Sequence, residues 1–509
     1  MTKRFTAAIP LMVVLLLAVL LRFSAIGWGG PFVYHPDEHL IVHPALNIVR
    51  TRDLNPHWFQ YPSLLIYFEA ALVTVCQPWV GAPLSSNAEQ NHIGPWDVLP
   101  AQWPFVLAGR CLVAALAVLG IGLTYWVAAR LGGPATGFAA ALFLVASPLH
   151  NESSHYLTTD VPATTLLTAT LLASVRCLQQ SKRGDIFAAG LFAGLAAATK
   201  YTAGIAIVVP LGLLLTRSAH TTFIRWALLG SAALIGFLLA CPYAVLDWPS
   251  LLGGILEQRR NYLGGYTPGG NWLWYLDYLY AIGLGAPLAI LCAAGLLITP
   301  TLRRRRLHWI LAALCVGYFA FYSSYPSRAE RNLILLLPLL CLLAADLLVE
   351  FLRRLMNDTA ATIAACTLAT VIAAPGLQRS IANNQSLSQP DTRTLAAQWI
   401  DENVPNGRHI AREEYTPQVD SSRYAVTYEW SLAMHHYAWY VANEVDYLVV
   451  SSNVYGRVLN PPYIAVPAEA AFYQFVFDRL PLLQEINPAP DHPGPTIRIY
   501  GVPRGQDDF

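Results

Sequence analysis

Five carboxyl and imidazole side chains fall within eleven residues in the stretch VYHPDEHLIVH, residues 33–43. Asp37 and Glu38 stand side by side there, directly after an apolar N-terminal segment. A partly desolvated carboxylate beside a second carboxylate has a raised pKa, which suits a general base or a group that orients a hydroxyl. A structural role is the alternative, because Pro36 favours a helix start that puts both carboxylates in the first turn, where the helix dipole stabilises them.

The histidines of this stretch raise the question of a metal site. His35, His39 and His43 are spaced by four residues, so His39 and His43 could share one helical face. The zinc-binding order His-Glu-x-x-His is absent, since Glu38 precedes His39. Zinc sites need several converging ligands, which one helix rarely supplies. We therefore expect no metal ion and interpret the histidines as interfacial groups.

A second polar cluster follows another apolar run, in SPLHNESSHYLTTDVPATT at residues 147–165. Its ionisable members are His150, Glu152, His155 and Asp160. Asp160 precedes Val161 and Pro162, a pattern in which an aspartate caps the helix that follows. The functional alternative is that Asp160 meets Asp37 across a shared cleft.

Basic residues form a third group, at the ends of apolar segments that we expect to face away from the cytoplasm. They are Arg110, Lys200, Arg259, Arg260, Arg328 and Arg331. Cations on that side run against the usual bias toward the cytoplasmic face. A lipid phosphate explains them as a set, whereas any single one is more often a headgroup contact. The aromatic and Gly-rich residues 257–280 accompany them, either as an interfacial belt or as a loop that covers a site.

The composition places these groups in an integral membrane protein. Of 509 residues, 55% are hydrophobic and 12% charged, and the mean hydropathy is +0.42. Soluble domains average about 25% charged residues, and a bilayer-crossing helix needs about 20 apolar residues. About eleven transmembrane helices are predicted, at residues 6–28, 106–130, 134–149, 160–178, 186–199, 202–217, 224–246, 276–299, 308–323, 332–352 and 358–376.

Basic residues distinguish the two faces of the membrane. With a cytoplasmic N-terminus, the inside turns carry Lys3, Arg4, Arg130, Lys182, Arg183, the run Arg303 to Arg306, Arg353 and Arg354. The longer outside segments carry fewer basic residues, and an odd number of spans puts the C-terminus outside. We predict a transmembrane domain over residues 1–378 with a large first outside loop at 29–105. A small extracytoplasmic α/β domain would follow over 379–509, and the topology fits a bacterial inner membrane.

Patterns inside the outer segments predict their elements. The first loop contains two amphipathic stretches, 39–53 and 62–80, which predict interfacial helices. The tail predicts helices at 391–404 and 469–480 and strands at 445–452 and 496–502. The eight cysteines lie mostly in or beside apolar segments and form no C-x-x-C pair, so we expect neither a disulfide framework nor a thiolate metal site.

Several motifs, taken in order, resemble one known family. They are YHPDE (34–38), QYPSLLIYFEA (60–70), SPLHNESSHYLTTDVP (147–162), GLAAATKYTAG (194–204), ERNLILLLPLL (330–340), LAAQWIDENVPNG (395–407) and HPGPTIRIYGVP (492–503). Together they resemble the C-type (GT-C) glycosyltransferases, in the family 39 and PMT_2-like branch that includes protein O-mannosyltransferases and lipid A aminoarabinose transferases. Gln60 and Tyr61 stand where that branch has His-Pro, and Asn332 replaces its aromatic residue. These departures bear on the subfamily and therefore on the acceptor.

The resemblance implies an inverting transferase that moves a hexosyl or pentosyl group from a polyprenyl-phosphate-linked donor to a hydroxyl on the extracytoplasmic face. The acceptor would be a protein, a lipid or a glycan. Asp37 or Glu38 would be the catalytic carboxylate. The substrates would contact His35, Tyr61, Arg110, Asp160, Lys200, Arg259, Arg328 and Arg331. Neither a metal nor another cofactor is implied, and we expect membrane lipids but no nucleic acid among the partners.

Two other classes of protein share this hydropathy profile. A secondary transporter usually keeps its charges or broken helices near the bilayer midplane, often in repeated halves. A non-catalytic binding or scaffold protein would tolerate the loss of Asp37. The ionisable groups here gather at one face, and no fixed-period repeat is visible, which favours the enzyme.

Overall fold

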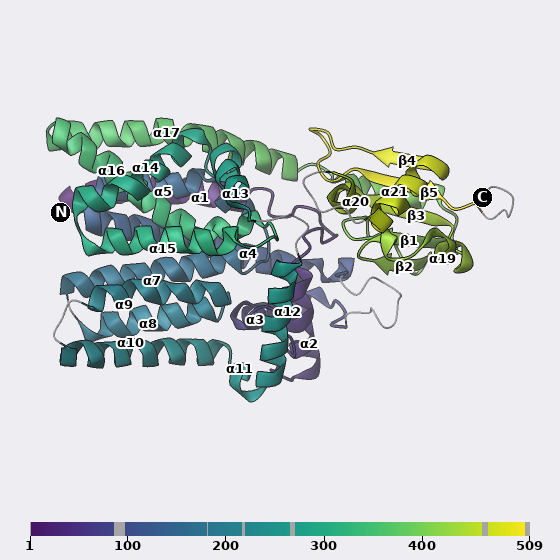
Figure 1. Cartoon of the computed structure of the whole chain (residues 1–509), viewed down its shortest axis with the longest axis horizontal. Helices are drawn as coiled ribbons and strands as arrows, with labels where there is room; N and C mark the ends of the chain where they lie inside the picture. The colour runs from purple at the N-terminus through teal and green to yellow at the C-terminus, as the bar shows by residue number, and fades with distance from the viewer. Residues whose placement is uncertain are drawn as a thin grey trace.

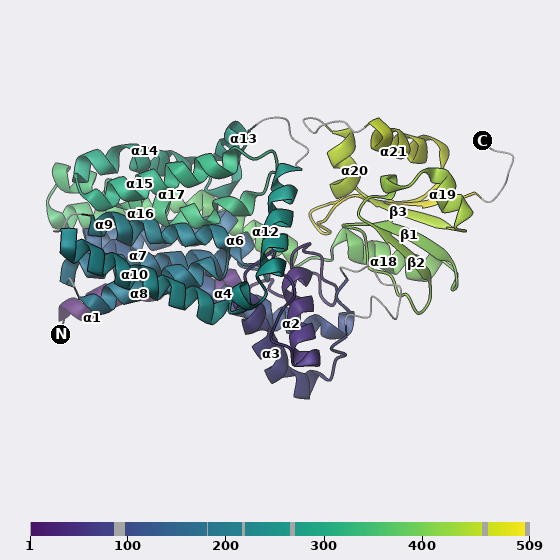
Figure 2. The ribbon, with the colours of Figure 1, turned by 60° about the horizontal axis from the view of Figure 1, so that its bottom comes forward.

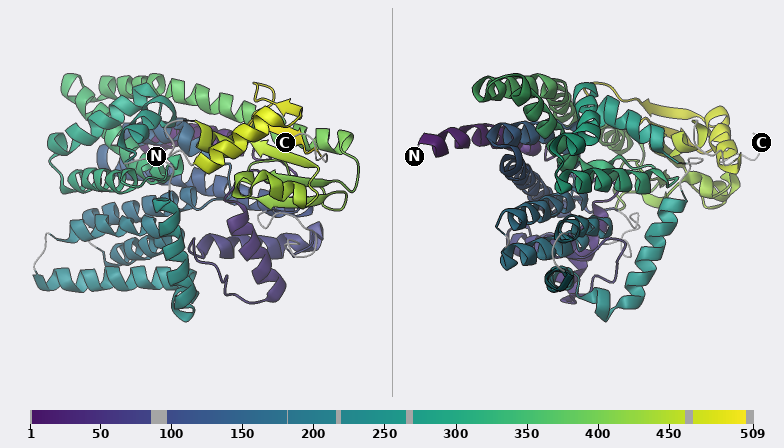
Figure 3. Two further views of the ribbon diagram at one scale, coloured as in Figure 1. Left: turned by 45° about the vertical axis from the view of Figure 1, so that its right-hand side comes forward. Right: turned by 60° about the vertical axis from the view of Figure 1, so that its left-hand side comes forward.

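The computed structural model describes residues 2–85, 97–180, 182–215, 219–264, 270–460 and 467–503. A bundle of long helices occupies one end of the molecule and a five-stranded sheet domain the other (Figure 1). The N-terminus lies at the bundle end away from the sheet domain, as the right-hand view of Figure 3 also shows. The predicted fold class, a polytopic helical membrane protein with a small C-terminal α/β domain, is therefore confirmed.

Each apolar segment predicted from the sequence contains helix. The corresponding elements are α1 (Thr2–Phe23), α4 (Trp103–Gly132), α5 (Pro134–Ala146), α7 (Asp160–Gln180), α8 (Arg183–Ala197), η2 (Tyr201–Ile207) with α9 (Val208–Leu214), α10 (Ala219–Ala240), α14 (Ala286–Arg303), α15 (Arg306–Ser323), η4 (Glu330–Leu336) with α16 (Leu337–Leu355), and α17 (Asp358–Leu387). Within the described residues, six helices are long and apolar enough to cross a membrane: Pro100–Gly132, Asp160–Gln180, Thr222–Ala240, Ala286–Arg303, Glu330–Leu355 and Asp358–Asn403. The count of about eleven spans stays a prediction.

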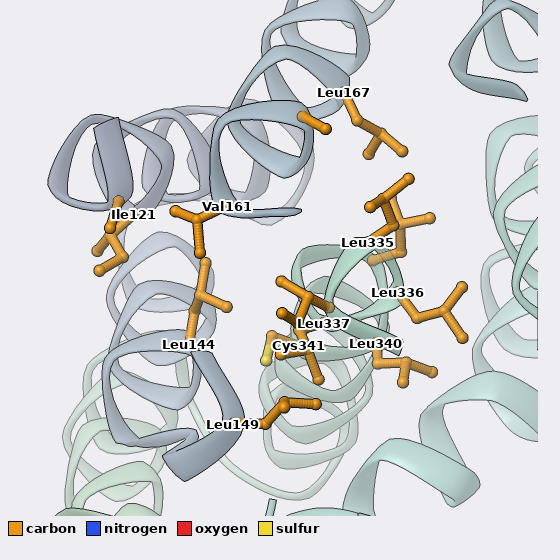
Figure 4. Close-up of a cluster of buried hydrophobic side chains, with 14 of the residues drawn as sticks. Ile121, Leu144, Leu149, Val161, Leu167, Leu335, Leu336, Leu337, Leu340 and Cys341 are labelled. Carbon is orange, nitrogen blue, oxygen red and sulfur yellow. The ribbon is translucent and has the colours of Figure 1, made fainter. Parts of the chain in front are cut away.

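Helix α16 is the centre of the bundle. Its apolar stretch is completely buried, and Leu337 and Cys341 belong to the same buried cluster as Leu144 of α5 and Val161 of α7 (Figure 4). Helices in a bilayer associate chiefly through close van der Waals packing, for which small residues are needed where backbones approach. Gly376 of α17 is such a residue, because a Cβ there would lie 2.3 Å from the backbone oxygen of Ala146.

Short helices cover the bundle end that faces the sheet domain. They are α2 (His39–Thr51), α3 (Leu64–Val80), η1 (Pro100–Gln102), α6 (Pro148–Ser153), α11 (Tyr243–Leu246), α12 (Trp248–Leu263), α13 (Trp272–Tyr278) and η3 (Leu279–Gly283). The two interfacial helices predicted in the first loop are thus present as α2 and α3. Helix α12 runs across the direction of the bundle helices, beside α2 and α3 (Figures 1 and 2).

The sheet domain is a mixed sheet with strand order β2-β1-β3-β5-β4. Its strands are β1 (His409–Glu413), β2 (Ala425–Glu429), β3 (Tyr447–Ser451), β4 (Leu482–Ile486) and β5 (Ile497–Gly501). The first three are parallel, and β5 pairs antiparallel with β3 and β4. The predicted strands at 445–452 and 496–502 are confirmed as β3 and β5, whereas β1, β2 and β4 were not predicted.

Helices cover both faces of this sheet (Figure 2). They are α18 (Thr392–Asn403), η5 (Leu432–Met434), α19 (Tyr437–Ala442), α20 (Ser452–Leu459) and α21 (Pro467–Arg479). Ile410 and Val449 pack with Ile400 of α18, while Leu448 and Val450 pack with α19 to α21 on the other face. The helices predicted at 391–404 and 469–480 are confirmed as α18 and α21. Helix α17 runs through residue 378, the predicted domain boundary, so the sheet domain continues directly from a bundle helix.

A buried acid stands at the end of β1. Glu413 is fully buried, and its carboxylate accepts hydrogen bonds from the hydroxyl of Tyr473 (2.6 Å) and from the backbone N–H groups of Ser451 (2.8 Å) and Leu432 (3.1 Å). Burial raises the pKa of Glu413 to about 8. The folded state therefore holds a proton that an unfolded glutamate releases near pH 4.5.

This proton makes the stability of the sheet domain depend on pH. Because the folded state binds more protons than the unfolded state between about pH 4.5 and 8, the free energy of unfolding falls as the pH rises through that window. The shift corresponds to a loss on the order of 5 kcal/mol. We expect the thermal unfolding temperature of the detergent-purified chain to fall between pH 5 and pH 9. In Glu413→Gln, the unfolding temperature should depend less on pH. Glu402→Gln, at an exposed position, serves as the control. If the unfolding temperature of Glu413→Gln falls with pH as steeply as that of the wild type, Glu413 is not the group that holds the proton.

Candidate active site

Glu38 is locked in a buried ion pair at the start of α2. Its two oxygens each accept a 2.7 Å hydrogen bond from Arg110 of α4, and one also accepts a 2.8 Å bond from the backbone N–H of Leu157. Arg110 also donates to the backbone oxygen of Trp28 at 2.6 Å and stacks over the rings of Trp28 and Trp103. Both charged side chains are fully buried. A bidentate pair with this many partners ties the segment after α1 to α4.

Asp37 has different surroundings, although it is the adjacent residue. Its carboxylate is 13% exposed and forms an ion pair with Arg331 of η4. Its backbone N–H donates to Nδ1 of His35 at 3.2 Å, and the His35 ring packs 4.3 Å from the ring of Tyr156. Burial and the charge of Arg331 lower the pKa of His35 well below its usual value, so the imidazole is neutral. A carboxylate that water reaches, beside one cation, is suited to accept a proton or to orient a hydroxyl.

Asp160 and Lys200 form a second buried pair. The carboxylate of Asp160 lies at the first residue of α7, 2.5 Å from the ammonium of Lys200. The ion-pair partner of Asp160 is therefore Lys200. A cleft shared by Asp160 and Asp37 stays a prediction. The ammonium lies 5.8 Å from the ring centre of Tyr322. Burial raises the pKa of the Tyr61 phenol, and the charge of Asp160 raises it further, which places Tyr61 beside this pair.

Tyr262 connects the two pairs. Its hydroxyl donates to the side-chain oxygen of Asn332 at 2.9 Å, next to Arg331, and its ring lies 5.8 Å from Tyr322. It also interacts electrostatically with Lys200. Asn332, the residue that departs from the family motif, is thus the hydrogen-bond acceptor of Tyr262. Tyr262 belongs to the aromatic loop noted in the sequence, of which residues 265–269 lie outside the described part of the chain.

The remaining predicted cations lie in other surroundings. Arg328 donates to the side-chain oxygen of Asn271 at 2.7 Å and stacks 5.2 Å over the ring of Trp274. Arg259 is exposed on α12, and no ion pair is found for it among the described residues. The structure therefore gathers Asp37, Glu38 and their partners Arg331 and Arg110, but not Arg259.

The other two histidines of the first stretch are neutral groups inside the loop. Burial lowers the pKa of His39 to about 3 and that of His43 to about 4. His43 lies 3.0 Å from the backbone oxygen of Asp97. Within the described ranges of the chain, no three His, Cys, Asp or Glu side chains converge on a point where they could hold a metal ion. Metal independence of the activity stays a prediction.

Sequence reasoning missed the aromatic side chains that complete the site. These are Tyr156, Tyr262 and Tyr322, which come from three separate segments. Packing of the helices places Tyr156 against His35, and Tyr262 and Tyr322 near Lys200. Tyr156 lies inside the polar cluster at 147–165, so its place in the sequence could have indicated that it belongs to the site. Tyr322 lies at the end of an apolar helix and carries no pattern that distinguishes it from an interfacial tyrosine.

An apolar groove of about 750 Å³ leads away from this site along α4, α7 and α8. It begins at Leu64 and Thr199, next to Lys200, and reaches Arg176 and Asp185 near the far ends of α7 and α8. From Pro162 to Arg176 the rise along α7 is about 21 Å, at about 1.5 Å per residue. Its walls include Leu116, Leu119, Leu166, Leu172 and Phe192.

Comparison with known proteins assigns the fold. Residues 106–246 match the family model described as dolichyl-phosphate-mannose-protein mannosyltransferase, PMT_2. Over the whole chain, the structure is similar to that of ArnT from Cupriavidus metallidurans bound to undecaprenyl phosphate, with a TM-score of 0.55 and 13% identity over 96% of this chain and 97% of that chain. The chain has the GT-C fold, and its residues 106–246 resemble the PMT_2 family. The family match begins on α4 and includes Arg110, Asp160 and Lys200.

A second solved structure supports the GT-C assignment. The oligosaccharyltransferase of Archaeoglobus fulgidus, tethered to an acceptor peptide, is similar with a TM-score of 0.56 and 12% identity, over 93% of this chain and 71% of that chain. No curated protein matches this chain. The predicted resemblance to the GT-C, PMT_2-like proteins is confirmed.

Proposed function

We propose that this protein transfers a sugar from a polyprenyl-phosphate-linked donor to a hydroxyl acceptor on the extracytoplasmic face, with inversion at the anomeric carbon. The observation that carries the proposal is the ion pair of Asp37 with Arg331, beside the buried pair of Asp160 with Lys200. A base and two cations at one end of a membrane bundle are the groups that such a transfer needs.

In the proposed reaction, Asp37 accepts or orients the proton of the acceptor hydroxyl. The acceptor oxygen attacks the anomeric carbon, the bond from that carbon to the phosphate oxygen breaks, and polyprenyl phosphate leaves with the electron pair. The developing negative charge on the phosphate falls beside Arg331 and Lys200, where charges that are already oriented stabilise it most. Binding of the phosphate by Arg331 would also free the carboxylate of Asp37 for the acceptor. Glu38 and Arg110 hold the segment that carries Asp37.

The apolar groove supports a lipid-linked donor. A polyprenyl chain that lay along α7 and α8 would bring its phosphate to Lys200, at the groove end lined by Thr199. The similar ArnT structure is bound to undecaprenyl phosphate, which fits a carrier of this kind. Arginines at the opposite bundle end, including Arg303 and Arg353, support a cytoplasmic N-terminus and an extracytoplasmic sheet domain in a bacterial inner membrane.

The test uses purified protein in detergent with a panel of polyprenyl-phosphate hexoses and pentoses, with and without protein, lipid and glycan extracts. We expect release of free polyprenyl phosphate from at least one donor, without added metal. The donor that is used identifies the sugar, and the extract that accelerates release identifies the acceptor class. Absence of release with every combination would contradict the proposal, and proton-coupled uptake of a solute into vesicles would instead support a transporter.

Lys200→Gln is expected to weaken donor use without removing the base. Loss of a charge-assisted hydrogen bond costs about 1.5–3 kcal/mol, which corresponds to a rise in KM for the donor of about 10- to 150-fold. The single variant also leaves Asp160 buried without its cation, so Lys200→Gln with Asp160→Asn should recover thermal stability but not the donor KM. Arg408→Gln, on the sheet-domain surface, is the matched control. An unchanged KM in both Lys200 variants would remove this residue from the donor site.

A further inference from the structure

The sheet domain is fixed against the loop that carries Asp37. Arg393 of α18 donates to the backbone oxygen of Tyr34 at 3.0 Å, and its guanidinium lies 4.1 Å over the Tyr34 ring. The Tyr34 hydroxyl lies 2.9 Å from that of Thr394. Arg412 of β1 forms a buried ion pair with Asp97, the residue whose backbone oxygen contacts His43. The domain is therefore held on both sides of the acidic pair.

Three side chains of this domain form a cluster near the site: Tyr415, Trp430 and Arg457. Tyr415 follows β1, Trp430 follows β2 and Arg457 belongs to α20. The Arg457 guanidinium lies 5.2 Å from the ring centre of Tyr415 and 5.6 Å from that of Trp430, and it donates to the Tyr415 hydroxyl at 3.1 Å. The two rings meet edge to face at 6.1 Å. We call these three residues the Arg457 cluster.

One member of the Arg457 cluster, Tyr415, lies within electrostatic reach of the reacting centre. The phenol of Tyr415 is close enough to the guanidinium of Arg331 for an electrostatic interaction, and Arg331 is the cation paired with Asp37. Tyr415 also has a φ of +60°, a left-handed conformation that costs a bulky side chain free energy. Backbone strain of this kind concentrates at ligand-binding sites, where the surrounding structure maintains it.

The charge of Arg457 is available for a ligand. Within the described residues it forms no ion pair, and its one hydrogen bond uses one of five N–H donors. Glu414 is within electrostatic reach, and its carboxylate accepts a hydrogen bond from the hydroxyl of Tyr428. A guanidinium binds phosphate and carboxylate through two parallel hydrogen bonds, and an aromatic ring beside it offers a flat contact surface. Trp430 is 41% exposed and provides such a surface.

From this arrangement we infer that the Arg457 cluster is the acceptor-binding subsite and that it takes a saccharide carrying a phosphate or carboxylate. Arg457 holds the anionic group and Trp430 contacts the sugar ring, which directs a hydroxyl toward Asp37. The inference rests on the proposed function, because it names the acceptor class of the same site. It also gives the sheet domain a role in selecting that acceptor.

The test measures binding, so it does not depend on donor turnover. Glucose 6-phosphate, glucuronate, glucose and inorganic phosphate are titrated calorimetrically into the full-length protein in detergent. We expect both anionic sugars to bind at least about tenfold more tightly than glucose and than inorganic phosphate, as loss of one charge-assisted contact implies. Equal binding of the anionic sugars and glucose would overturn the inference, and so would binding of inorganic phosphate as tight as that of glucose 6-phosphate.

Variants assign the effect to the cluster. Arg457→Gln should remove the preference for anionic sugars, Arg457→Lys should keep part of it, and Trp430→Ala should weaken all the sugars together. Arg498→Gln is the matched control, since Arg498 also stacks on two rings of this domain but is paired with Glu485. A preference that survives in a folded Arg457→Gln variant would overturn the assignment. If wild-type protein binds anionic sugars but uses no donor, the proposed function fails while the subsite stands.

Discussion

Replacing Asp37 by asparagine is expected to reduce sugar transfer by about 10²- to 10⁴-fold, the range that a positioned general base contributes. Asparagine keeps the size of the side chain and its place before Glu38, but it neither accepts the hydroxyl proton nor carries the charge that pairs with Arg331. The measurement is the rate of polyprenyl phosphate release at saturating donor. The bundle should remain folded, because the carboxylate of Asp37 is 13% exposed and its ion pair joins a loop residue to Arg331 of η4, not two long helices of the bundle.

The control for this experiment is Asp401→Asn, which breaks a more exposed aspartate–arginine pair in the sheet domain, at 2.9 Å from Arg423. It should leave release unchanged. Donor binding should survive in Asp37→Asn, since Arg331 no longer has a carboxylate competing with the phosphate. Turnover within threefold of wild type in Asp37→Asn would exclude Asp37 as the base, whatever the donor.

The largest effect of a single substitution on stability is expected at the adjacent residue, Glu38. Breaking a buried ion pair by removing one partner costs about 3–5 kcal/mol, because the other charge remains buried without compensation. Glu38→Gln leaves Arg110 in that position, surrounded by the rings of Trp28 and Trp103. We expect the thermal unfolding temperature of Glu38→Gln to fall strongly. Protein that is still folded at low temperature should keep donor turnover within about tenfold of wild type, a much smaller loss than replacement of a base causes.

Two further variants test the physical reason. Replacing both partners, as Glu38→Met with Arg110→Met, should recover part of the lost stability, because no unpaired charge is left. Glu350→Gln breaks a 2.7 Å pair with Arg303 near the other end of the bundle, where the glutamate is 18% exposed, and should cost much less. If Glu38→Gln unfolds at the wild-type temperature but has lost turnover, Glu38 would be the catalytic carboxylate and Asp37 would not.

Much of the fold could be predicted from the sequence because its signals are local. A long apolar run becomes a helix in a bilayer, since the backbone must satisfy its own hydrogen bonds there. Helices α2, α3, α18 and α21 and strands β3 and β5 follow from periodicity in the same way. Strands β1, β2 and β4 are short, and their burial depends on helices from other parts of the chain, so their sequences carry little alternation.

The position of the acidic pair could also be predicted from the sequence, but the different roles of its two carboxylates could not. Asp37 and Glu38 are equivalent in a pattern, and they differ only because Arg110 and Leu157 approach Glu38 from distant segments. Asp160 likewise suggested a helix cap or a partner of Asp37, and it is the packing of α7 against the segment after α8 that gives it Lys200.

By itself, then, the sequence determined that this is a membrane protein whose ionisable groups gather at one end, and it indicated the GT-C class through its motifs. The tertiary structure alone decided which charges neutralise each other, which cation reaches Asp37, and which sheet-domain residues lie beside the site. The physical reason is that hydropathy and periodicity act over a few neighbouring residues. The state of a buried charge depends instead on the partners and the desolvation that long-range packing supplies.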